Sequence, residues 1–117
     1  MLKNAHGSER RCSPRIAINL PVSLECNEHV LECKLIDISM CGIGLISNAT
    51  LPVCTPAIIR LKLPNEDGFI NMKLQAKITR CTKIREQYLI GLQFVDLSSF
   101  HEYELSAFFS YHSRFSA

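Results

Sequence analysis

Apolar and polar residues alternate along several short segments of this 117-residue chain. In residues 70–78, for example, Ile70, Met72 and Leu74 fall on one face of an extended strand, and Asn71 and Lys73 fall on the other. Because successive side chains of a strand point to opposite faces of a sheet, this pattern predicts strands with one buried face. Strand patterns occupy residues 16–26, 29–38, 43–47, 57–63, 70–78 and 88–95.

Two of these segments carry irregularities. Pro21 has no N–H to donate to a ladder, so the first strand is expected to be an edge at that point. In the second strand, Ile36 and Ile38 fall on the face opposite Leu35, which predicts a β-bulge or sharp twist near Leu35–Ile36.

The spacing of apolar residues along the chain changes after residue 95. Six residues recur at three- and four-residue steps: Phe100, Tyr103, Ala107, Phe108, Tyr111 and Phe115. This spacing predicts an amphipathic helix over about 97–113 with a buried aromatic face. Ser99 and Glu102 have the spacing of a capping box at its start.

These elements together predict a mainly β fold. Six short antiparallel strands tend to close on themselves, because closure removes exposed edges. We therefore expect a six-stranded antiparallel barrel over about 16–95, with the C-terminal helix covering one mouth. A chain of this length normally forms one domain.

Charge is unevenly distributed. Residues 1–15 hold four basic residues and one acidic residue, whereas the remaining residues hold nine basic and ten acidic ones. A neutral body with a cationic N-terminal strip is not typical of a general nucleic-acid binder. There is no secretory segment and no apolar run of the roughly 20 residues that a membrane span requires, so we expect a cytoplasmic protein without membrane insertion.

The residue types that carry chemistry are scattered. The six cysteines lack zinc-ligand spacing and are expected to be free thiols, mostly buried, with a disulfide framework as the alternative. The four histidines form no ligand set, and no phosphate-binding glycine loop is present. We therefore expect no enzyme activity, no metal and no cofactor.

Two short motifs remain. The first is "RRCSPR", with Arg10, Arg11 and Arg15. Pro14 disfavours helix at the residue before it, so the segment is extended or turning. Guanidinium groups suit phosphate oxygens and the O6/N7 edge of guanine, and they stack on base faces. A solvated basic tail is the alternative for such a cluster taken alone.

The second motif is "DISMCGIG", from Asp37 to Gly44. Asp37 and Ser39 are expected to share one face of a strand end, and Gly42 permits a turn or the close approach of a ligand. A carboxylate beside a hydroxyl can accept hydrogen bonds from the N1–H and amino group of guanine, or orient an arginine. A simple turn that ends the strand is the alternative.

Together the two motifs resemble the PilZ domain family, receptors for the bacterial second messenger cyclic di-GMP. Arg11 and Arg15 form RxxxR, and Asp37, Ser39 and Gly42 form [D/N]xSxxG, with one strand and a hairpin between them. The resemblance covers residues 9–117 after a tail at 1–8, and it implies a six-stranded antiparallel barrel.

The resemblance also implies a ligand site. Arg11 and Arg15 would bind phosphate and guanine, and Asp37, Ser39 and Gly42 would line the facing wall. Arg10, just before the motif, is compatible with an intercalated ligand dimer, and Arg80 near the end of the fifth strand is a further candidate contact. Ligand binding would order the N-terminal strip and relay a signal to an unidentified protein partner, in the control of motility, pili, biofilm or virulence.

Two rival functions stay open on the sequence. The first is a divergent member of the family that binds only proteins and no nucleotide, although the intact motifs argue against this. A small barrel that binds RNA or single-stranded DNA usually carries stacking aromatics on its strands. Here the aromatic residues gather in the helix, so we expect no nucleic-acid partner.

Overall fold

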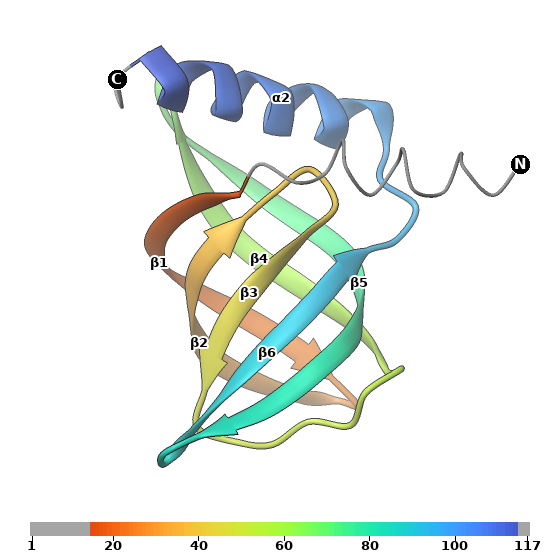
Figure 1. Ribbon diagram of the computed structural model, residues 1–117. Coiled ribbons are helices and arrows are strands. Elements are labelled where there is room, and N and C mark those ends of the chain that lie inside the picture. The colour runs from red at the N-terminus through yellow and green to blue at the C-terminus, as the bar shows by residue number, and fades with distance from the viewer. Residues whose placement is uncertain (1–14, 115–117) are drawn as a thin grey trace, which may run out of the picture.

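The computed structural model describes residues 15–114, so the predicted tail and residues Arg10 and Arg11 lie outside the described part of the chain. Within these residues, six strands and one helix follow one another (Figure 1): β1 (Ile16–Cys26), β2 (His29–Ile38), β3 (Gly42–Ser47), β4 (Pro56–Asn65), β5 (Gly68–Ile84), β6 (Gln87–Phe94) and α2 (Ser99–Arg114). The strands form a closed antiparallel barrel in the order β1-β2-β3-β6-β5-β4. The predicted six-stranded barrel with a C-terminal helix is therefore confirmed.

The fifth strand is longer than its sequence pattern predicts. Alternation ends at Ile78, but β5 continues to Ile84 and pairs with β6 as far as Gln87. The pattern stops because a register shift lies between Ile78 and Arg80, which puts side chains beyond it out of phase. Arg80 consequently lies within the strand, several residues before its end.

The barrel is closed weakly at one seam. β1 pairs with β4 only at Ser23, Glu25 and the residue between them, whereas β1 pairs with β2 along most of its length. Extending this register two residues beyond Ser23 would bring Pro21 opposite Lys62. Because Pro21 has no N–H, the ladder ends before it, as the predicted edge at Pro21 requires.

Helix α2 covers one mouth of the barrel (Figure 1) and contacts β4. Leu105 and Phe108 are fully buried, and Phe109 and His112 pack beside Phe108 with ring centroids 5.4 and 5.6 Å from it. The buried face is therefore rotated from the predicted one. Leu105, Phe108, Phe109 and His112 share one side of the helix, and Leu105 and Phe108 are its fully buried residues. Within residues 15–114, no helix is both long and apolar enough to cross a membrane.

Two aromatic residues that were expected to be buried are instead solvent-exposed. Phe100 is 55% exposed and Tyr103 is 69% exposed. The capping interaction is also displaced by one residue from the predicted pair. The Ser98 hydroxyl, not that of Ser99, accepts a hydrogen bond from the backbone N–H of His101 at 3.1 Å.

Removing the buried Phe108 ring of α2 should destabilise the whole domain. Phe108→Ala should lower the free energy of unfolding by about 3–5 kcal/mol, because it deletes a buried ring and leaves a cavity at the barrel mouth. Tyr103→Ala on the same helix is the matched control and should change it by about 0.5 kcal/mol or less. Urea unfolding of both variants measures this, and equal losses would contradict the orientation of α2.

The described cysteines differ in burial and in bonding. Cys26, Cys33, Cys54 and Cys81 are free thiols, as expected, but only Cys26 and Cys33 are buried. Burial raises the pKa of both buried thiols, because the thiolate would lose its hydration. Cys41 departs from the expectation of free thiols, since it is disulfide-bonded. It lies in the half-buried turn between β2 and β3, outside the apolar core.

Thiol reactivity should follow this division. In the native protein near pH 8, Cys54 should react with iodoacetamide well before Cys26 and Cys33, which are both less accessible and less ionised. Peptide mass mapping after timed alkylation measures the order. Simultaneous labelling of all three cysteines below the unfolding transition would contradict the described core.

Candidate functional site

One ion pair joins the start of β1 to the end of β2. The Arg15 guanidinium donates to Asp37 through Nη2 at 3.0 Å and through Nε at 3.3 Å. Both nitrogens approach the same oxygen, Oδ1, and no hydrogen bond from residues 15–114 reaches Oδ2. The two side chains are 46% and 33% exposed, so the pair lies on the surface. The structure thus brings together one residue from each sequence motif.

A β-bulge turns Asp37 outward. In the pairing of β2 with β3, Leu35 faces Leu45 and Asp37 faces Gly44, which leaves Ile36 as the extra residue. Strict alternation from buried Leu35 would send the Asp37 side chain into the barrel. The bulge reverses the phase, so Asp37 faces outward and Ile38 is buried. The predicted bulge near Leu35–Ile36 is therefore present, and it positions the carboxylate.

A second bulge has the same effect on Arg80. In the pairing of β5 with β6, Ile78 faces Leu92 and Arg80 faces Gly91, which leaves Thr79 as the extra residue. Ile78 is fully buried, so without the bulge Arg80 would point into the core. The Thr79 hydroxyl bonds the carbonyl oxygen of Gly91 at 3.1 Å. Arg80 is exposed on the outer face as a result.

Two glycines lie between these outward-facing side chains. Asp37 pairs with Gly44, Gly44 with Gly91, and Gly91 with Arg80, so the four residues form one row across β2, β3, β6 and β5. The Asp37 carboxylate and the Arg80 side chain each lie within contact distance of the position that a Cβ would occupy on the adjacent glycine. We call this row, floored by Gly44 and Gly91, the glycine trough.

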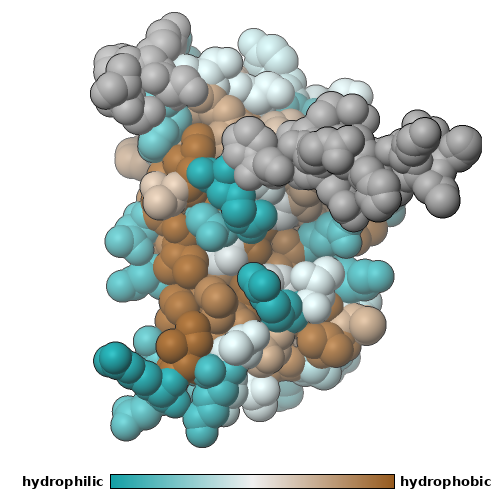
Figure 2. Space-filling view, viewed as in Figure 1, coloured by the Kyte–Doolittle hydropathy of each residue, from teal (hydrophilic) through white to brown (hydrophobic). Residues whose placement is uncertain are grey.

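The surface next to the trough is apolar. Ile46 and Leu89 pair in the same two strands, two residues along from Gly44 and Gly91, so they lie on the same outer face. Figure 2 shows that hydrophilic side chains on this side of the molecule stand out from a surface that is otherwise largely hydrophobic or neutral. A low, apolar floor between an acid and a base can accept a flat ring.

Ser39 and Gly42, the other two residues of the second motif, lie at the turn between β2 and β3. Ser39 is fully buried, and its hydroxyl accepts the backbone N–H groups of Cys41 and Gly42 at 3.1 and 3.2 Å. A Cβ on Gly42 would overlap the carbonyl oxygen of Leu92 on β6. Both residues therefore build the turn between β2 and β3, and only Asp37 of this motif faces the outer surface.

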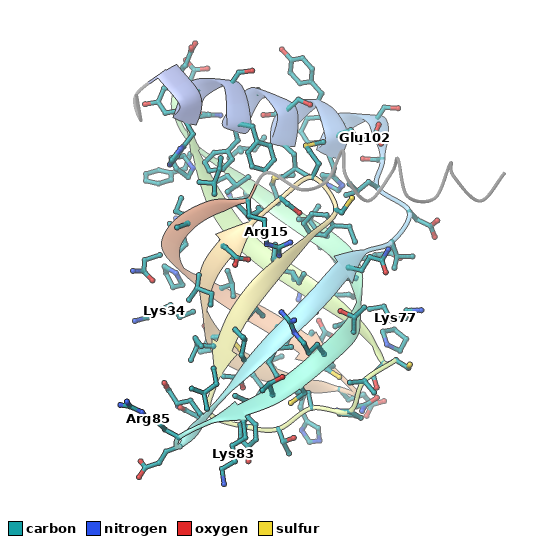
Figure 3. The ribbon with its side chains drawn as sticks, in the orientation of Figure 1. Arg15, Lys34, Lys77, Lys83, Arg85 and Glu102 are labelled. Atoms are coloured by element: carbon teal, nitrogen blue, oxygen red, sulfur yellow. The ribbon has the colours of Figure 1, made fainter. Side chains whose placement is uncertain are left out.

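Arg15 lies at the end of the barrel that α2 covers, whereas Lys83 and Arg85 lie at the opposite end (Figure 3). Within residues 15–114, Arg15 forms an ion pair with Asp37, whereas Arg80 forms none. Such a surface can bind an anion at Arg15 and present acceptor oxygens to a base edge at Asp37. Sequence reasoning missed Gly91 entirely, because nothing in the pattern of β6 shows that it pairs with Gly44 and Arg80.

The two kinds of glycine should differ in their tolerance of a side chain. Gly42→Ala should cost about 1–3 kcal/mol of stability, since the added methyl meets the rigid backbone of β6. Gly91→Ala should stay within about 0.5 kcal/mol, because its Cβ would make ordinary contacts with Arg80 and Thr79 at 3.5 Å or more. Thermal and urea unfolding test the pair. Equal destabilisation would contradict the close approach of β3 to β6 at Gly42.

The chain matches the profile of the family described as PilZ domain over residues 9–109. No curated protein matches it. Among solved structures, it is similar to the Bacillus subtilis inhibitor of motility MotI/DgrA (TM-score 0.72, 16% identity), covering 86% of this chain and 48% of that one. It therefore spans about half the length of MotI.

Two further solved structures share the fold. The PilZ domain of YcgR from Escherichia coli, solved with c-di-GMP, has a TM-score of 0.67 and 15% identity, covering 86% of this chain and 90% of that one. A pathogenic protein of Xanthomonas campestris, a tetrameric PilZ domain self-assembled through a helical bundle, has a TM-score of 0.71 and 13% identity, with both chains fully covered. At these identities the likeness concerns the fold alone.

Proposed function

Because the chain belongs to the PilZ domain family, we propose that it is a receptor that binds cyclic di-GMP across the glycine trough. The single observation that carries this proposal is the row Asp37–Gly44–Gly91–Arg80, with Arg15 paired to Asp37 at its edge. This row joins the two sequence motifs to Arg80 on one face of the barrel. The YcgR domain, solved with c-di-GMP, shows that this fold can hold the nucleotide.

Each part of the trough suits one part of the ligand. Cyclic di-GMP carries two phosphates and two guanines, and the Arg15 guanidinium matches a phosphate or the O6/N7 edge of a guanine. Asp37 keeps Oδ2 free of hydrogen bonds from residues 15–114, so this oxygen can accept from a guanine N1–H or amino group. The Arg80 guanidinium can stack on a base that lies over Gly91.

Arg10 and Arg11 complete the proposed site. They lie outside the described residues, but Arg11 is four residues before Arg15, which is described and directly precedes β1. Four residues of extended chain span at most about 14 Å, so Arg11 can reach the same ligand. Arg10 would offer one more group for phosphate or guanine and would suit an intercalated pair of ligands.

Ser39 and Gly42 support binding through the turn. The Ser39 hydroxyl is already used by two backbone N–H groups, so we assign it to holding the β2–β3 turn rather than to touching the nucleotide. Loss of this turn would release the end of β2, on which Asp37 stands. In this proposal the DxSxxG motif supplies one ligand contact, Asp37, and the turn that orients its side chain.

The energetics favour an exchange of partners at Arg15. A surface ion pair such as Arg15–Asp37 contributes only about 0–1 kcal/mol, so releasing either group to the ligand costs little. Ordering the N-terminal strip would cost about 1–2 kcal/mol per fixed residue. Charge-assisted hydrogen bonds at about 1.5–3 kcal/mol each would offset this cost. The output would be a rearranged surface that a protein partner reads, for which motility control is the leading process.

Calorimetric titration with cyclic di-GMP tests the proposal. Arg15→Ala should weaken binding by about tenfold or more, because it removes at least one charge-assisted contact. Arg60→Ala is the matched control: Arg60 is also 46% exposed and pairs with Glu25 at 2.8 Å, but it stands on β4. The control should bind as the unaltered protein does, and circular dichroism should show both variants folded.

Three results would overturn the proposal. The first is unchanged affinity in Arg15→Ala, and the second is equal loss in Arg15→Ala and Arg60→Ala. The third is binding of GTP, cyclic GMP or an oligonucleotide as tight as that of cyclic di-GMP. A folded protein that binds none of these ligands would favour the alternative, a family member that binds only proteins.

A further inference from the structure

The seam between β1 and β4 leaves two strand edges unpaired. The two strands pair only from Ser23 to Glu25 on β1 and from Arg60 to Ile58 on β4. On the helix side of this short ladder, residues 16–22 of β1 pair only with β2, and residues 61–65 of β4 pair only with β5. Within residues 15–114, no strand pairs with the other edge of either segment. Free edges of this kind can accept an added strand.

A groove lies at this seam. It has a volume of about 620 Å³ and is lined by Leu20 and Pro21 from β1, Leu61 and Lys62 from β4, and Met72 from β5, among others. Leu61 and Met72 are buried and form its floor. Phe69 at the start of β5 also lines it and is 66% exposed. The groove can therefore bury apolar side chains.

The rim of the groove is cationic. Arg60, Lys62 and Lys73 all line it, against a single acid, Glu32. Arg60 and Lys73 are directly opposite each other in the β4–β5 register, and like charges in that position repel. Arg60 pairs with Glu25, and Glu32 accepts a hydrogen bond from Ser23. No ion pair within residues 15–114 neutralises Lys62 or Lys73.

We propose that this groove is a docking site for an extended, acidic segment of a partner protein, which adds as a strand alongside β4. In an added strand, alternate side chains would point toward the floor at Leu61 and Met72, and the others would point outward beside Lys62. The partner segment should therefore alternate apolar residues with aspartate or glutamate. This surface is distinct from the glycine trough, and the proposal does not depend on nucleotide binding.

Charge argues against the chain's own N-terminal residues as the occupant. Residues 1–14 carry Lys3, Arg10 and Arg11 against one acid, Glu9, so the cationic rim would repel them. A second copy of the chain would bring another cationic groove to the seam. An acidic partner segment is the occupant that the charges favour.

Selection from a display library of random twelve-residue peptides on the full chain tests the proposal. We expect the selected peptides to alternate acidic and apolar residues. By fluorescence anisotropy, the variant Lys62→Glu/Lys73→Glu should bind them roughly tenfold more weakly or worse, and binding should fall as salt is added. The variant Lys77→Glu/Lys83→Glu carries the same change of charge elsewhere on β5 and should bind like the unaltered protein. A proline in the middle of the peptide should abolish binding, because it removes a ladder donor.

Four outcomes of the peptide experiments would overturn the proposal. They are the absence of any selected peptide, selected peptides without the alternation, equal binding by the two double variants, and full binding of the proline-substituted peptide. Self-association that Lys62→Glu/Lys73→Glu abolishes, measured by sedimentation velocity, would also overturn it, because it would assign the groove to a second copy. Cyclic di-GMP titration of the same variants separates the two sites: retained nucleotide affinity with lost peptide binding is expected.

Discussion

Two β-bulges place the charged side chains of Asp37 and Arg80 on the outer surface of this barrel. In a closed barrel, side chains alternate strictly between core and surface, so the identity of an exposed residue is fixed by its phase in the strand. The extra residues Ile36 and Thr79 each shift that phase by one. Without them Asp37 and Arg80 would point into an apolar core, where a charge is costly to bury. The candidate site therefore depends on two local departures from the ladder.

The two strands between the bulges, β3 and β6, each place a glycine in the row, and glycine has no side chain. Gly44 and Gly91 are neighbours across β3 and β6, so no side chain stands between Asp37 on β2 and Arg80 on β5 in this row. In the proposed complex, a ligand that spans the trough would meet this floor, with Arg15 at its edge beside Asp37.

Much of this fold follows from sequence, because alternation reports directly on burial. The barrel, the helix, the bulge near Ile36 and the edge at Pro21 were all predictable on that basis. The bulge at Thr79 was not, since Thr79 and Arg80 are both polar and leave no apolar residue out of phase. The orientation of α2 was also missed, because aromatic residues fill more than one of its faces, and only the packing of Leu105 and Phe108 selects between them.

The candidate site was predictable in part. The resemblance predicts Asp37, Ser39 and Gly42 together as one wall of the site. In the structure the Asp37 carboxylate faces outward, and the buried Ser39 hydroxyl and Gly42 build the turn next to it. Residue spacing along the chain carries no information on which residues become neighbours across strands. The pairing of Gly44 with Gly91, and hence the trough itself, required the observed order of β3 beside β6.

The most direct test of the account is an amide chemical-shift titration of the isotope-labelled protein with cyclic di-GMP. If the nucleotide binds across the trough, the amide signals of Asp37, Gly44, Arg80 and Gly91 should shift together and saturate at one concentration, while those of Lys62 and Lys73 at the β1–β4 seam should remain in place. Saturable shifts centred on the seam, with the four trough residues unmoved, would contradict it.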